Sequence, residues 1–190
     1  MERAAAASGR APEVVVTRDP AVVRSAAYIV VPGQGAFGAF AQGIAGGLDD
    51  ALREHVAAER PYLGICLGMQ ILFETSEEAP GALGLGLMAG QVKRVAPGID
   101  PITDRPHSLP HIGWNSVESV AATEGSAPYF YFAHSFAVVP VDPALVSGTT
   151  TYGDARFASA IARGAVLGVQ FHPEKSQREG LALLARFCEL

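Results

Sequence analysis

The chain has 190 residues, of which 49% are hydrophobic and 17% are charged. That length is sufficient for one domain with a substantial core, and that composition argues against a disordered chain. The net charge of −5 and the absence of a basic segment argue against nucleic-acid binding. No run of apolar residues in the sequence is long enough to span a membrane.

The cysteine content and the first residues indicate a reducing compartment. Two cysteines, Cys66 and Cys188, are too few for a disulfide framework. The first ten residues lack the apolar segment of a signal peptide. We therefore expect both thiols to be free and the chain to be cytoplasmic.

Strands and helices are predicted to alternate in the first half of the chain. The β-branched runs Glu13–Thr17 and Tyr28–Gly33 predict buried strands, as does Tyr62–Ile65. Apolar residues at helical spacing predict a helix over Gly47–Arg60, which Pro61 ends, and a second helix over Leu67–Glu78.

The second half predicts mostly strands, followed by a C-terminal helix over Ser176–Leu190. The expected strands are Gly90–Val95, Gly113–Val120, Tyr129–Val139, Ser147–Tyr152, Phe157–Ala162 and Ala165–Phe171. This order predicts an α/β sheet with an added antiparallel portion. Without repeats or linkers, residues 1–190 are expected to form a single domain.

Cys66 stands between two glycines, Gly64 and Gly68, after a predicted strand and before a predicted helix. This is the pattern of a nucleophile elbow, in which a sharp turn exposes the nucleophile. The N-terminus of the following helix would favour the reactive thiolate. The alternative interpretation is a buried structural cysteine, but the pattern favours a nucleophile.

Among the five histidines, His172 is the best candidate for a catalytic base. The sequence His-Pro-Glu predicts that His172 and Glu174 project from one side of an extended segment. The carboxylate could then hold one imidazole nitrogen and leave the other for the thiol. By contrast, His55 is expected on the surface of a helix, and His107 and His111 in a loop or in packing.

A glycine-lined turn, Gly33–Gln34–Gly35, follows the second predicted strand. Its backbone N–H groups could stabilise an oxyanion together with the amide of Leu67. The same residues could instead form a phosphate-binding loop. However, the segment lacks the Lys-Ser/Thr pair of a P-loop, and no acidic residue follows at the spacing of a dinucleotide site.

Taken together, these motifs resemble the class I glutamine amidotransferases. The segments "PYLGICLGMQILFETSEE", "LPHIGWNSV", "YFYFAHSF" and "GVQFHPEKS" are similar, within that family, to the glutaminase subunits of imidazole glycerol phosphate synthases. The resemblance extends from about Glu13 to the C-terminus. It implies a flavodoxin-like fold, with a mostly parallel sheet covered by helices on both faces and an antiparallel extension.

The resemblance also implies roles for individual residues and for a partner. Cys66, His172 and Glu174 would form a catalytic triad that releases ammonia from L-glutamine through a thioester. The partner would be a (β/α)₈-barrel cyclase that receives this ammonia through a closed passage, and no metal or organic cofactor is implied. The remaining implied residues bind substrate or face the cyclase: Gln70, Glu78, Ser135 and Phe136 for the substrate, and Trp114, Tyr131 and Lys175 for the partner.

The N-terminal segment departs from the family pattern. The family begins with a strand, a Gly-Asn turn and a helix, whereas "MERAAAA" resembles the middle of that helix. The hypotheses are a start codon assigned too late or a truncated, impaired domain, and residues 1 to about 12 are expected to pack loosely. Gln34 and Phe136 also differ, because the family often has an apolar residue and a tyrosine at these positions.

Three other functions stay open at this level. The chain could be the glutaminase unit of another pathway, or a cysteine amidase or peptidase with the same elbow. It could also be a scaffold that has kept the triad but lost activity.

Overall fold

The computed structural model describes Met1, residues 13–119 and residues 127–190. Its helices and 3-10 turns are α2 (Pro20–Ser25), α3 (Phe37–Ile44), α4 (Leu48–Ala57), α5 (Leu67–Gln70), η1 (Pro143–Leu145), η2 (Pro173–Lys175) and α6 (Gln177–Phe187). Its strands are β1 (Ile29–Gly33), β2 (Tyr62–Cys66), β3 (Thr75–Ser76), β4 (Gly90–Arg94), β5 (Ile99–Asp100), β6 (Arg105–Pro106), β7 (His111–Ser116), β8 (Glu118–Ser119), β9 (Tyr129–His134), β10 (Phe136–Pro140), β11 (Val146–Tyr152), β12 (Ala155–Arg163) and β13 (Val166–Val169).

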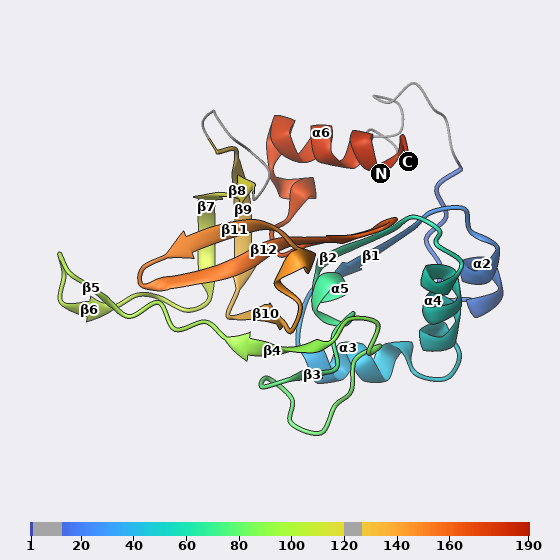
Figure 1. Ribbon diagram of the computed structural model, residues 1–190, viewed down its shortest axis with the longest axis horizontal. Coiled ribbons are helices and arrows are strands. Elements are labelled where there is room, and N and C mark those ends of the chain that lie inside the picture. The colour runs from blue at the N-terminus through green and yellow to red at the C-terminus, as the bar shows by residue number, and fades with distance from the viewer. Residues whose placement is uncertain (2–12, 120–126) are drawn as a thin grey trace.

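A six-stranded mixed sheet lies at the centre of the described residues, in the strand order β1-β2-β13-β12-β11-β8. β1, β2 and β13 pair in parallel, and the remaining neighbours are antiparallel. Helix α6 lies over one face of the sheet, and α3 and α5 lie on the other (Figure 1). The predicted α/β fold with an antiparallel extension is therefore confirmed.

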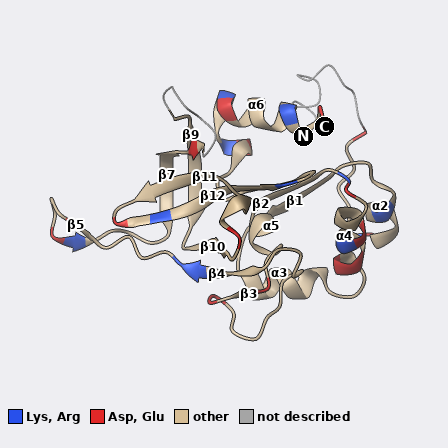
Figure 2. Cartoon of the chain, viewed as in Figure 1, with Lys and Arg blue, Asp and Glu red and all other residues tan. Residues whose placement is uncertain are grey.

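The central sheet separates two hydrophobic clusters. Successive side chains of a strand point to opposite faces, so Tyr62 packs into the cluster that contains α3 and α4, whereas Leu63 packs into the cluster that contains α6. Strands β1, β2 and β13 carry no charged side chain, and Figure 2 shows the charges concentrated on helices and outer segments. Parallel strands buried on both faces have this composition.

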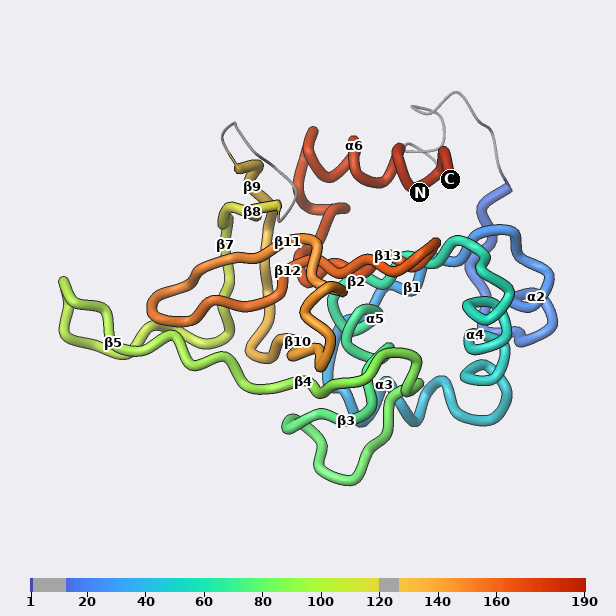
Figure 3. Tube along the Cα trace, in the orientation of Figure 1, coloured from blue at the N-terminus to red at the C-terminus, as the bar shows by residue number. Residues whose placement is uncertain are grey.

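Smaller sheets surround the central one. β10, β4 and β3 form a three-stranded sheet, and β7 pairs with β9 in an antiparallel ribbon. The hairpin β5–β6 projects from the body of the molecule, as the tube in Figure 3 shows. None of the helices in the described part of the chain is long and apolar enough to span a membrane.

The predicted strand Glu13–Thr17 is wrong, because this segment has no regular structure. The side chains of Val15 and Val16 are 56% and 99% exposed. β-branched residues favour a strand only where a neighbouring strand accepts and donates hydrogen bonds. Within the described residues β1 pairs with β2 alone, and Glu13–Thr17 does not extend this sheet. The prediction for residues 1 to about 12 lies, apart from Met1, outside the described residues.

The predicted helix Leu67–Glu78 is also wrong over most of its length, since α5 ends at Gln70. The chain then turns, and Thr75–Ser76 pairs with β4. The carbonyl oxygens of Ile71 and Phe73, which a longer helix would have used internally, accept hydrogen bonds from the amides of Leu85 and Gly86. Tertiary hydrogen bonds of the turning chain thus replace helical ones.

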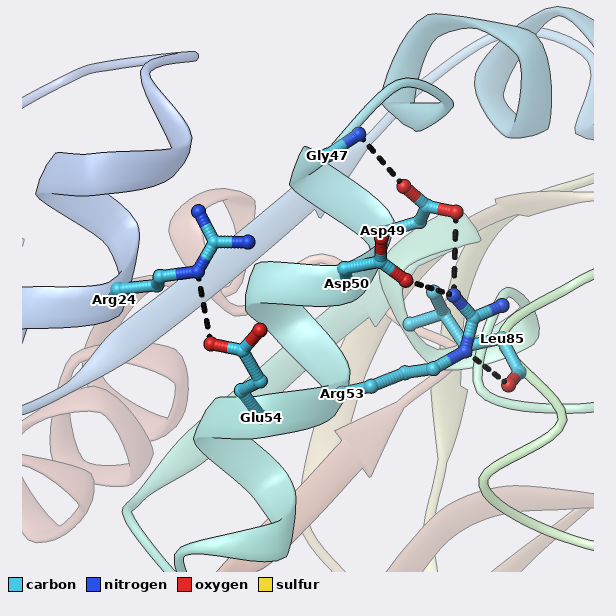
Figure 4. Close-up of polar contacts among 7 residues, drawn as sticks. All are labelled: Arg24, Gly47, Asp49, Asp50, Arg53, Glu54 and Leu85. Carbon is cyan, nitrogen blue, oxygen red and sulfur yellow. Dashed lines mark hydrogen bonds and ion pairs between the residues drawn. The ribbon is translucent and has the colours of Figure 1, made fainter.

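The predicted helix over Gly47–Arg60 is confirmed as α4, but the predicted surface position of His55 is wrong. The ring of His55 is fully buried, and its Nε2 atom lies 2.9 Å from the carbonyl oxygen of Pro61. Burial lowers the pKa of His55. The exposed side of α4 instead carries ion pairs, with Arg24 contacting Glu54 at 2.8 Å and Arg53 contacting Asp49 at 3.2 Å (Figure 4).

Candidate active site

Cys66 lies at the C-terminal end of β2, where the chain turns into α5. Its backbone has φ 54° and ψ −108°, a conformation that costs a non-glycine residue on the order of 1–3 kcal/mol. A nucleophile elbow has this strained geometry, so the predicted turn is present. Helix α5 has only four residues, and its dipole therefore contributes less to the thiolate than the predicted longer helix would.

Two glycines make the elbow possible. A Cβ atom on Gly64 would overlap the carbonyl group of Gly68, and a Cβ atom on Gly68 would overlap the carbonyl group of Val31. The hydroxyl of Tyr62 donates a buried hydrogen bond of 2.8 Å to the carbonyl oxygen of Gly68. The Gly-x-Cys-x-Gly spacing thus follows from the close approach of the turn to β1 and β2.

His172 follows strand β13, the parallel neighbour of β2, and this pairing brings its imidazole to Cys66. Cys66 and His172 line the same pocket, and the sulfur is close enough to the imidazole to be the largest cause of its altered pKa. His172 Nδ1 donates a hydrogen bond of 2.7 Å to Glu174 Oε1. Glu174 reaches the ring from the 3-10 turn η2 and not from an extended segment, so the predicted convergence has a different backbone cause.

These contacts change the charge of the imidazole. The neighbouring sulfur of Cys66, and then the hydrogen bond with Glu174, raise the pKa of His172 to about 9, against the opposing effect of burial. The bond to His172 helps to lower the pKa of Glu174, against its own desolvation. At neutral pH the ring is therefore an imidazolium, with Nδ1–H directed to Glu174 and Nε2–H directed to the sulfur.

A pocket of about 180 Å³ opens at the elbow. Its volume is below the range typical of drug-sized ligands and suits a small metabolite. The lining includes Cys66, His172 and all eight residues predicted for oxyanion and substrate binding: Gly33, Gln34, Gly35, Leu67, Gln70, Glu78, Ser135 and Phe136. The strand register explains why Gly33 lies beside the nucleophile, because Gly33 of β1 pairs directly with Cys66 of β2.

The polar groups of the pocket are held in place by the backbone. Glu78 Oε2 accepts a hydrogen bond of 2.8 Å from the amide of Phe37, at the start of α3. Gln70 Nε2 donates one of 3.0 Å to the carbonyl oxygen of Phe136. A fixed carboxylate and a fixed amide in one small pocket can bind an ammonium group beside the nucleophile.

The three residues implied for the partner surface form one patch. Trp114 and Tyr131 pair across β7 and β9, with ring centroids 6.2 Å apart. The ammonium group of Lys175 lies 5.8 Å from the centroid of the Tyr131 ring, and Lys175 also lines the pocket. Exposed Ile112 and Tyr129 lie on the same two strands. We call these five residues the aromatic patch.

Sequence reasoning missed Gln170 and His134. Gln170 is fully buried and contacts Cys66, and His134 lines the pocket. A signal for Gln170 was available, because it precedes His172 by two residues and alternate residues of a strand face the same side. His134 had no comparable local signal.

The fold and this site define a glutamine amidotransferase, and the chain belongs to the class-I glutamine amidotransferase family, whose model matches residues 3–189. It is 43% identical over 180 residues to imidazole glycerol phosphate synthase subunit HisH of Pyrococcus furiosus, covering 92% of this chain and 88% of that protein. It is 45% identical over 183 residues to the HisH subunit of Moorella thermoacetica, covering 93% and 83%.

The fold agrees with solved structures of the same class. A crystal structure of a glutamine amidotransferase superposes with a TM-score of 0.72 at 19% identity, over 100% of this chain and 92% of that one. At that identity the likeness concerns the fold alone.

Proposed function

We propose that this chain is the glutaminase subunit of an imidazole glycerol phosphate synthase. It hydrolyses glutamine to glutamate and ammonia and delivers the ammonia to a cyclase subunit. The observation that carries the proposal is that Cys66 and His172 line one pocket, where Glu174 holds the His172 ring by a hydrogen bond. The HisH relatives support the assignment to histidine biosynthesis.

The first half-reaction follows from the protonation states of the site. The Cys66 thiolate, paired with the His172 imidazolium, attacks the side-chain amide carbon of glutamine. Negative charge develops on the amide oxygen, which faces the Gly33–Gln34–Gly35 turn and the Leu67 amide. His172 then transfers its Nε2 proton to the departing nitrogen, so ammonia leaves and a thioester remains on Cys66.

The second half-reaction uses the imidazole that the first one has made neutral. His172 takes a proton from a water molecule, and the resulting hydroxide attacks the thioester. Glutamate leaves, and the thiolate and the imidazolium are restored. Glu174 accepts the Nδ1–H bond throughout, which holds the ring in the orientation that this proton transfer needs.

The aromatic patch is the surface that we assign to the cyclase. Aromatic side chains are enriched where protein interfaces bind most strongly. Trp114 is 47% exposed, and Lys175 belongs both to this patch and to the lining of the pocket. Docking there would cover the mouth of the pocket and keep ammonia out of bulk water, where it would be protonated.

The test uses the complex with its cyclase and two nitrogen sources. Cys66→Ala should abolish synthesis from glutamine and leave synthesis from added ammonia intact. Cys188→Ala is the matched control, because Cys188 is also a buried cysteine but does not line the pocket, and it should keep both activities. Glutamine-dependent synthesis by Cys66→Ala would contradict the proposal.

A further inference from the structure

The side chain of Gln170 lies between the nucleophile Cys66 and the side-chain amide of Gln70. Its side chain is fully buried, and its Nε2 atom lies 3.5 Å from Cys66 Sγ. Its Oε1 atom accepts a hydrogen bond of 3.0 Å from Gln70 Nε2. The backbone amide of Gln170 donates to the carbonyl oxygen of Ser159 in β12, which fixes the position of the main chain.

The carbonyl group of Phe136 determines how the side-chain amides of Gln70 and Gln170 are oriented. The oxygen of Phe136 can only accept, so the atom of Gln70 that faces it must be Nε2. The second hydrogen of that Nε2 then needs an acceptor, and so Oε1 of Gln170 must face Gln70. The other end of the Gln170 amide is therefore an N–H donor, and it points at the sulfur.

His134 contacts the same carbonyl group and is itself contacted by His111. His134 Nδ1 lies 2.9 Å from the carbonyl oxygen of Phe136, so Nδ1 must be the protonated nitrogen. His134 Nε2 then accepts from His111 Nδ1 at 3.3 Å. Burial lowers the pKa of His134 to about 3 and that of His111 to about 4, so both rings stay neutral in the working range of pH.

We propose that Gln170 is a positioning residue that donates an N–H to the Cys66 sulfur and locks the amide of Gln70. This inference rests on the proposed function and adds a fourth side chain to its chemistry. Because both hydrogens of Gln70 Nε2 are already bound, Gln70 presents its oxygen to the pocket. An oxygen acceptor there selects an ammonium group of the substrate.

The donor acts when the sulfur carries negative charge. A thiolate accepts a hydrogen bond much more strongly than a thioester sulfur does, because charged acceptors form the stronger bonds. Gln170 therefore stabilises the resting nucleophile, and it stabilises the same thiolate again when the thioester breaks. His172 supplies the proton, and Gln170 supplies a donor whose charge does not change.

Two substitutions separate the two contacts of Gln170. Gln170→Glu keeps the shape and the oxygen that accepts from Gln70, but it puts a carboxylate oxygen next to the sulfur. Gln170→Leu removes both contacts. Ser159→Ala is the control, because Ser159 is equally buried in the adjacent strand and accepts a hydrogen bond from Thr150, but it does not line the pocket.

The main measurement is the rate at which iodoacetamide alkylates Cys66, followed by mass spectrometry from pH 5 to pH 10. Gln170→Glu should move the midpoint of this profile to higher pH by about one unit or more, because a second anion opposes the thiolate. Ser159→Ala should leave the midpoint unchanged. Steady-state glutaminase assays with the cyclase then give kcat and KM.

The kinetic expectations differ between the two variants. Gln170→Glu should lower kcat about tenfold with little change in KM, because the Gln70 contact is retained. Gln170→Leu should also raise KM for glutamine, because the Gln70 amide is no longer fixed. If Gln170→Leu does not fold, the alkylation midpoint and the kcat of Gln170→Glu alone test the inference.

If Gln170→Glu had the same alkylation profile and the same kcat as the wild-type chain, the inference would be overturned. So would an equal displacement of the alkylation profile by Ser159→Ala, since the effect would then be a general loss of packing. Failure of the proposed function is distinguishable, because it would appear as glutamine use by Cys66→Ala. The alkylation profile does not depend on what Cys66 catalyses.

Discussion

Gly64→Ala is predicted to have a large effect on the elbow. The added Cβ atom would overlap the carbonyl group of Gly68 and the amide of Met69. These are backbone atoms, so no side-chain rotation relieves the overlap. β2 cannot move aside either, because Gly64 pairs with Val31 on one side and Gly168 on the other.

The structure thus places this substitution at the upper end of overpacking costs, about 3 kcal/mol of the free energy of unfolding. For a chain of this length that loss lowers Tm by roughly 6–12 °C. Displacement of the elbow should also lower glutaminase kcat by more than tenfold, since reactive groups tolerate little misplacement. Thermal unfolding followed by circular dichroism and glutaminase assays with the cyclase measure the two effects.

Gly43→Ala is the matched control, because a Cβ atom there meets no other atom within 4 Å. Gly43 lies inside α3, where alanine is preferred over glycine by roughly 0.5–1 kcal/mol. We expect Gly43→Ala to be as stable as the parent chain or slightly more so. If Gly64→Ala and Gly43→Ala shared one Tm and full activity, the steric reasoning would be refuted.

Two further predictions concern the charge of His172 and the aromatic patch. NMR titration of the His172 imidazole should give a pKa of about 9. Cys66→Ala and Glu174→Gln should each lower that pKa, and Cys66→Ala should lower it more. Because the pKa in the folded state lies above the ordinary value of 6.5, the contribution of this ring to stability is complete below pH 6.5 and is lost as the pH rises through about 9. An imidazole that titrates near 6.5 would contradict the contacts. Trp114→Ala should weaken cyclase binding about tenfold or more by calorimetry, whereas Val141→Ala, at an exposed apolar residue outside the patch, should not; equal losses would argue against the patch.

The parts of the site that sequence could predict depend on short-range rules. Gly64, Cys66 and Gly68 lie within five residues, and the space that forces a glycine at position 64 is local to that turn, whereas Gly68 is forced by Val31 of β1. His172 and Glu174 are likewise two residues apart, so their contact is local, although the 3-10 turn η2 and not the predicted extended segment produces it. That such short motifs also resemble a known family made the fold class predictable.

The parts that sequence could not predict depend on distant partners. Valines over Glu13–Thr17 favour a strand, but a strand forms only where another offers its edge. The periodicity after Leu67 favours a long helix, but the chain gains more from pairing Thr75–Ser76 with β4. His55 on a helix could face either way, and the folded structure buries it with its Nε2 atom beside the carbonyl oxygen of Pro61.

The parallel pairing of β2 with β13 has a consequence for partial unfolding. The sulfur and the imidazole are carried by the ends of two neighbouring strands that are buried on both faces, whereas the hairpin β5–β6 has few contacts with the body. Amide protons along β2 and β13 should therefore exchange with deuterium only when the whole molecule opens, and those of the hairpin should exchange early. We expect heating to loosen the periphery first, while the reactive pair stays assembled until the final cooperative transition.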